Sequence, residues 1–87
     1  MTVTFLPIEL ALPGRGVEAR LVLYEGRLCA VLSCLEPELD GAAGWFVEAA
    51  FGRLHEPYNP TFSALGSVEA WVLTRLADDG NSTGQTP

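Results

Sequence analysis

Two cysteines are the first candidates for chemistry, because thiolates act as nucleophiles, metal ligands and disulfide partners. Cys29 and Cys34 stand in a segment with the alternation of a strand. A strand rises by about 3.3 Å per residue, so the two Cα atoms would lie roughly 16 Å apart, beyond disulfide reach. With a single histidine they also fall short of four zinc ligands. We expect two thiols in a reducing cytoplasm, no metal and no cofactor.

His55 is the single histidine, and therefore the one side chain with an ordinary pKa near neutrality. It stands beside Glu56 in a proline-rich loop, where a lone histidine is usually solvated. We therefore predict no catalytic residue and no enzymatic activity. The alternative is a small-molecule binder or small enzyme with its pocket near His55 and Tyr58.

Residues 14–19 spell G-x-G-x-x-A, the fingerprint whose glycines let a backbone approach a dinucleotide pyrophosphate. That fingerprint must follow a strand and open a helix, whereas here it precedes strand-like alternation. We therefore expect no nucleotide site.

Glu36, Glu38 and Asp40 form an acidic group around Pro37. The group lacks the spaced oxygen ligands and the glycine of a calcium loop, so we expect a solvated loop.

The charge of the chain limits its partners. Eleven acids oppose five arginines, lysine is absent, and the formal net charge is −6. Because nucleic-acid binding needs cations that contact phosphates, we expect no nucleic-acid partner. No apolar run reaches the roughly 18 residues of a membrane span, and the first residues lack the basic start of a signal peptide. We expect a cytoplasmic protein of bacterial or phage origin.

The elements that must position these residues are organised around residues 17–34, which have the pattern of a β-hairpin with its turn at Glu25-Gly26. If Tyr24 lies opposite Arg27, the register assigns every other residue of the hairpin to a face. One face is wholly apolar, with Val17, Ala19, Leu21, Leu23, Leu28, Ala30, Leu32 and Cys34. The other is mixed, with Glu18, Arg20, Val22, Tyr24, Arg27, Cys29, Val31 and Ser33.

Strands flank this hairpin. Residues 2–12 predict a first strand, which Pro7 confines to a sheet edge or a bulge. Residues 45–54 fit either a strand or a short helix, and we prefer the strand because Gly44 and Gly52 bracket only seven residues.

The last predicted element is an amphipathic helix over residues 63–78, with Leu65, Val68, Val72 and Leu76 on one stripe. The fold class is α+β, a small antiparallel sheet of three to four strands in β-β-β-β-α order with the helix packed on one face. We expect one domain, residues 1–78, and a disordered polar tail, residues 79–87.

One helix covers one face of such a sheet, which leaves the mixed face open unless the first strand or the loop at 36–44 covers it. Apolar residues interspersed with arginine and tyrosine are typical of protein interfaces. The interface candidates are Arg20, Val22, Tyr24, Arg27, Cys29, Val31, Phe46 and Glu48. We expect a non-catalytic interaction protein that forms a homodimer or binds another protein, with no membrane and no small-molecule partner. A lesser alternative is an acidic phage-type inhibitor.

Overall fold

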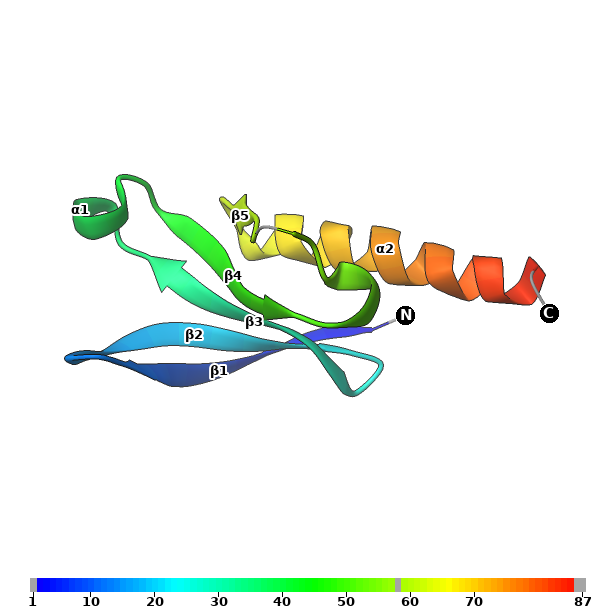
Figure 1. Ribbon diagram of the computed structural model, residues 1–87, viewed down its shortest axis with the longest axis horizontal. Helices are drawn as coiled ribbons and strands as arrows, with labels where there is room; N and C mark the ends of the chain where they lie inside the picture. Colours follow the sequence, from blue (N-terminus) through cyan, green and yellow to red (C-terminus); the bar gives the residue numbers. More distant parts are fainter. Residues whose placement is uncertain (1, 58, 86–87) are drawn as a thin grey trace.

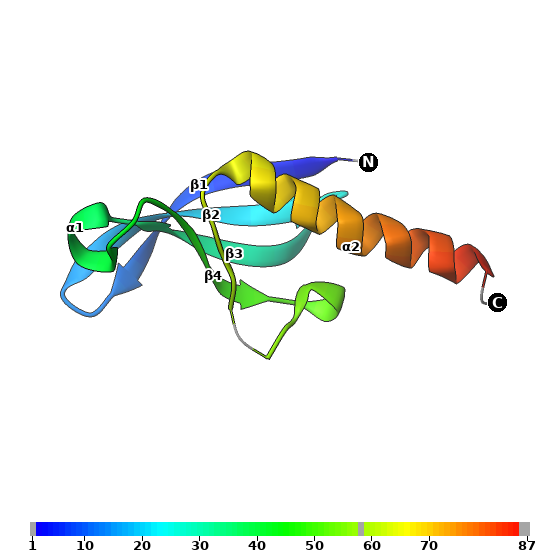
Figure 2. The same ribbon diagram turned by 90° about the horizontal axis from the view of Figure 1, so that it is seen from above.

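The fold is an antiparallel sheet with one long helix across one face, as a computed structural model shows (Figures 1 and 2). It describes residues 2–57 and 59–85; the side chains of residues 15, 39, 40 and 78–85 lie outside the description. The strands follow the chain order across the sheet: β1 Val3–Leu12, β2 Arg15–Tyr24, β3 Arg27–Leu35, β4 Gly44–Ala50 and β5 Thr61–Phe62. The helical elements are α1 Pro37–Asp40, the 3₁₀ turn η1 Gly52–Leu54 and α2 Leu65–Gln85.

The α+β prediction is therefore confirmed, with two-residue β5 as an addition to the expected strands. The ambiguous segment is strand β4. Helix α2 begins at Leu65, and its described backbone extends beyond the predicted end at residue 78, to Gln85. The domain boundary at residue 78 and the disordered tail stay predictions, and residues 86–87 lie outside the described part.

The turn of the β2–β3 hairpin forms where the sequence places it. Glu25 and Gly26 both have positive φ, 53° and 80°, as the favoured two-residue hairpin turn requires. Tyr24 lies opposite Arg27, and Leu23 lies opposite Leu28. The predicted register is thus confirmed next to the turn.

Beyond these pairs a bulge at Cys29 changes the register. Val22 lies opposite Ala30, so Cys29 is an extra residue on β3. An extra residue reverses the alternation of every side chain that follows it on that strand. A second bulge at Glu48 on β4 places Val31 opposite Ala49 but Leu32 opposite Val47.

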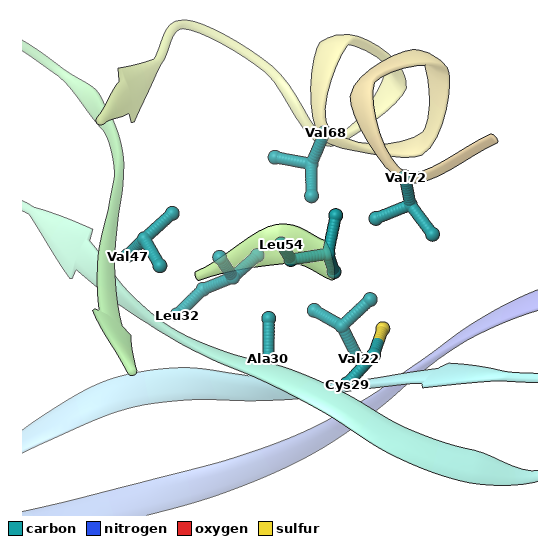
Figure 3. Packing of buried hydrophobic residues seen from close by; sticks show 8 residues of the cluster. All are labelled: Val22, Cys29, Ala30, Leu32, Val47, Leu54, Val68 and Val72. Atoms are coloured by element: carbon teal, nitrogen blue, oxygen red, sulfur yellow. The ribbon is translucent and has the colours of Figure 1, made fainter. Parts of the chain in front are cut away.

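The first bulge overturns the predicted faces. Helix α2 covers the face that carries Val22, not the face that carries Leu21 and Leu23. Figure 3 shows Val68 and Val72 of α2 pointing toward this face of the sheet. Leu54 of η1 lies between the helix and the strands. The buried cluster consists of Val22, Cys29, Ala30, Leu32, Val47, Leu54, Val68 and Val72.

Strand β1 is an edge strand, as Pro7 predicts. Pro7 lies opposite Arg20 in a continuous ladder, so it causes no bulge. Proline cannot donate a hydrogen bond to a further strand, which protects this edge from pairing with another chain.

Candidate interaction surfaces

Among the residues that the structure describes, no helix lies on the sheet face opposite α2, hereafter the open face (Figure 1). Register and strand alternation assign the side chains to this face, because they define which residues lie on the same side as Val22. Its apolar residues are Leu6, Ile8, Leu10, Leu12, Val17, Ala19, Leu21, Leu23, Leu28, Val31, Leu35, Phe46 and Ala49. Leu6 is 42% exposed and Leu28 is 45% exposed. The open face is therefore a continuous apolar surface.

One end of the open face is hollowed. Val17, Ala19 and Ser33 are buried there. A cavity of about 260 Å³ at this end is lined by Leu12, Val17, Ser33, Cys34, Leu35, Phe46 and Glu48.

Ser33 of β3 and Glu48 of β4 form a polar part of the cavity wall, and a hydrogen bond joins them. The hydroxyl of Ser33 donates to Oε2 of Glu48 over 2.7 Å. Ser33 lies on the open face by the register, so its bond brings the Glu48 carboxylate to that face, whereas Glu9 and Glu18 of the paired strands lie on the covered side. This hydrogen bond engages the carboxylate of Glu48 at the surface of the sheet.

A second hollow, hereafter the tip groove, lies between the β2–β3 turn, η1 and α2. It has a volume of about 390 Å³ and is lined by Tyr24, Arg27, Leu28, Cys29, Phe51, Gly52, Arg53 and Leu76. Two of these described lining residues are arginines, and none of the eight is acidic. Phe51 is 49% exposed, which makes it a large apolar side chain without cover.

The structure separates the eight predicted interface residues. Val22 and Cys29 are buried under α2, and Tyr24 packs against the same cluster. The prediction that these three belong to an open surface is therefore wrong, because the bulge and α2 place them on the covered face.

Arg20 and Arg27 of the predicted set also lie away from the open face. Arg20 donates to Oε2 of Glu18 over 2.9 Å, and its guanidinium lies 5.0 Å from the ring centroid of Trp45. This geometry permits a cation–π contact. Arg27 lines the tip groove.

Of the predicted interface residues, the structure brings three together on the open face: Val31 and Phe46 by the register, and Glu48 by its hydrogen bond to Ser33. The residues that the prediction missed are mostly on β1, among them Leu6, Ile8 and Leu10. These apolar residues alternate in the sequence. The predicted register lacked the bulge, however, and therefore placed the apolar face of the sheet under the helix.

The candidates for chemistry lie apart from one another. His55 is exposed and lines neither hollow, and Tyr58 lies outside the described residues. Cys29 and Cys34 are both free cysteines. Burial raises the pKa of the Cys29 thiol to about 11, against a smaller lowering by a backbone hydrogen bond. This thiol is therefore protonated at neutral pH and a poor nucleophile.

The remaining sequence motifs also show no site. Strand β2 begins at Arg15, so the glycine motif at 14–19 opens a strand. Glu36 directly precedes α1 and Glu38 lies within it, and both are exposed. Among the described residues, no group of three histidines, cysteines or acids is arranged to hold a metal ion. Within the same part of the chain, no helix has the length and apolar character to cross a membrane.

Comparison with protein-family models, with curated proteins and with solved structures found no match for this chain.

Proposed function

We propose that this chain is a non-catalytic interaction protein that self-associates, with the open face of one copy packed on that of a second. The observation that carries the proposal is the uncovered apolar surface of β1–β4, where Leu6 and Leu28 are both more than two-fifths exposed. Contiguous apolar surface on a sheet is typical of an interaction site. Two sheets that pack face to face also form a common core arrangement.

Charge favours a second copy as the occupant. The chain carries a net charge of −6, which would oppose association if the acids lay on the contact surface. Glu48 is at the open face, where Ser33 binds its carboxylate. Glu9 and Glu18, the acids of β1 and β2, lie on the covered side by the register, outside the contact, where solvent and salt screen their repulsion.

The size of the open face also suits a dimer. Four strands at about 4.8 Å spacing, with roughly eight residues each at about 3.3 Å, cover about 500 Å². Two copies would bury about 1,000 Å² together, which reaches the lower limit for a specific interface. A twofold axis makes the same surface serve both copies.

Pairing at the sheet edges is a weaker route to association. Pro7 interrupts the donors along β1, and two-residue β5 offers few backbone groups at the opposite edge. The face is thus the larger of the two kinds of surface.

Light scattering on the purified chain tests the proposal. At tens of micromolar we expect a mass of about twice the 9.3 kDa chain. Leu6→Glu should give the monomer mass, because it places a charge in the contact. Ala70→Glu, on an exposed position of α2, is the matched control and should leave the dimer intact. A monomeric wild-type chain would refute the proposal.

We further propose a cytoplasmic location. Its support is the pair of cysteines that no disulfide joins, as is usual in a reducing compartment.

A further inference from the structure

We propose that the cavity of about 260 Å³ at one end of the open face, hereafter the socket, receives Leu23 and Leu28 of a second copy. This inference rests on the proposed self-association and specifies how the two copies meet. They are related by a twofold axis that lies between the two sheets and runs across the strands. Its support is the order of large and small side chains along the open face.

The register divides the open face into four rows that cross the strands, because residues paired in a sheet lie side by side. The first row, next to the β2–β3 turn, consists of Thr4, Leu23 and Leu28. The second row consists of Leu6, Leu21, Val31 and Ala49. The third row consists of Ile8, Ala19, Ser33 and Phe46. The fourth row contains Leu10, Val17 and Leu35.

The first row projects, whereas the third and fourth rows are hollowed. Leu28 of the first row is 45% exposed. Ala19, Ser33 and Val17 are all buried, and Ser33 and Val17 line the socket. Each copy therefore presents a projection near the turn and a hollow toward the opposite end of the same face.

A twofold axis across the strands brings the projection of each copy to the hollow of the other. Two sheets that pack face to face can be related by a twofold axis in the plane between them. With that axis midway between the second and third rows, the first row of one copy lies on the fourth row of the other. Leu23 and Leu28 then lie over the socket, whose lining includes Val17 and Leu35 of the partner subunit. The symmetry forms this contact twice.

The two central rows are complementary in size under the same rotation, which places the second row of each copy on the third row of the other. Three of the four contacts join a large side chain to a small one: Leu21 with Ala19, Val31 with Ser33, and Phe46 with Ala49. The fourth joins Leu6 to Ile8 at the β1 edge. Large side chains opposite small ones let two layers interdigitate without voids.

An axis parallel to the strands gives a poorer contact. It would place β2 on β3 and each row on its own counterpart in the second copy. Leu23 would then lie on Leu28 of the partner subunit, and Ala19 on Ser33 of the partner subunit. The projections would collide while the hollows faced each other, and both overpacking and voids lower stability. The axis across the strands is therefore favoured.

The volume of the socket suits this pair of leucines. Each leucine side chain has four carbon atoms. At the ~30 Å³ that a water molecule occupies in the liquid, two such side chains need about 240 Å³. The socket, at about 260 Å³, can therefore hold both.

The polar part of the socket can be covered without loss of a hydrogen bond. The hydroxyl of Ser33 already donates to Oε2 of Glu48. A buried donor that keeps its acceptor avoids the cost of an unsatisfied polar group. Leucine side chains are thus compatible with this lining.

Nuclear Overhauser effects between copies of the wild-type chain test the inference. The dimer is assembled from equal amounts of ¹³C-labelled and unlabelled chain, and isotope filters select the contacts between copies. We expect contacts from the methyl groups of Leu28 to Val17 and Leu35 of the partner subunit. Contacts from Leu28 to Leu23 of the partner subunit would show the axis parallel to the strands and overturn the inference.

Two variants test the central rows by an exchange of size. The Ala19→Leu homodimer would contain two contacts between large side chains, and the Leu21→Ala homodimer two between small ones. A mixture of the two chains restores a large side chain opposite a small one at both positions. Native mass spectrometry separates the three dimers by mass. We expect the heterodimer to make up about four-fifths of the dimers or more, against about one-half for random pairing.

The matched control is a mixture of Ala70→Glu with the wild-type chain, which should pair at random because Ala70 lies on the exposed side of α2. Random pairing of folded Ala19→Leu and Leu21→Ala would overturn the socket and leave the dimer in place. So would a dimer in which Leu28 contacts no residue of the partner's fourth row. A monomeric wild-type chain would refute the dimer itself and the socket with it. The wild-type spectra decide the question even where a variant fails to fold.

Discussion

Val22 lies opposite Ala30 on the neighbouring strand, although the turn at Glu25-Gly26 places Leu23 opposite Leu28. The extra residue between these pairs, Cys29, decides which side of the sheet α2 covers. It brings Ala30 and Leu32 to the side of Val22, where Val68 and Val72 meet them (Figure 3). The leucines of β1 and β2 are left on the opposite side, and this is the origin of the open face.

Deletion of Cys29 tests this reading of the hairpin. Without it, Leu28 and Ala30 become neighbours and the observed pairs form a regular ladder, so the chain should fold with α2 docked. We expect a free energy of unfolding within about 2 kcal/mol of that of Cys29→Ala, which loses the buried thiol but keeps the bulge. Urea denaturation measures both.

In a hairpin without the bulge, the same deletion would exchange the two faces beyond Leu28 and disrupt the core. An unfolded deletion variant beside a folded Cys29→Ala would therefore contradict the observed register. Near-UV circular dichroism follows the docking of α2, because the rings of Phe62 and Trp71 lie 5.2 Å apart at the contact.

The sequence allowed the elements to be predicted better than their faces. The turn residues, the β-branched and aromatic residues of the first strand and the stripe of α2 are local features, and each predicted its element correctly. The bulge is different, because its position depends on which side chains fit under α2. Cys29 and Ala30 are both small enough to lie there together. No local pattern in the sequence indicates that the bulge forms at this position.

The open face and the tip groove could be predicted only in part from the sequence, for the same reason. Val31, Phe46 and Glu48 were assigned to an uncovered face, and they lie on one. Leu21 and Leu23 were predicted to lie on the face that the helix covers, but they lie on the uncovered face. The tip groove joins residues near 27, 52 and 76, whose proximity arises from tertiary packing alone.

Gly44 is required where β4 begins. Its φ is +138°, and a Cβ built there would lie 2.4 Å from the carbonyl oxygen of Phe62. Because that oxygen belongs to the backbone, Gly44→Ala must separate β4 from β5. We expect a loss of about 2–4 kcal/mol in the free energy of unfolding, measured with urea.

Gly41→Ala is the matched control for this position. Gly41 also has a positive φ, +82°, but an added Cβ would contact nothing within 4 Å. It should therefore show only the backbone strain, about 1–2 kcal/mol. Equal losses in the two variants would show that the contact with Phe62 is unimportant.

Gly66 in the first turn of α2 offers a stabilising change. An added Cβ would meet no atom within 4 Å, and alanine favours helix more than glycine does. Gly66→Ala should therefore raise the free energy of unfolding by about 0.5–1 kcal/mol. A fall in the urea midpoint at an unchanged slope would contradict this description of the helix start.

The buried thiol of Cys29 predicts how stability changes with pH. Burial raises its pKa to about 11 in the folded chain, whereas an unfolded thiol ionises near its ordinary value of about 8.5. Below the ordinary value both states hold the proton, and the contribution to stability is complete. As pH rises toward 11 the unfolded state loses its proton first, so the free energy of unfolding must fall.

Cys29→Ala isolates that fall, because all other groups titrate in both chains. Urea denaturation between about pH 7.5 and about pH 10.5 should show the wild-type chain losing stability more steeply than Cys29→Ala above about pH 8.5. Parallel curves would mean that the thiol is as accessible in the folded chain as in the unfolded one. That result would contradict its place in the cluster under α2, and with it the bulge that puts it there.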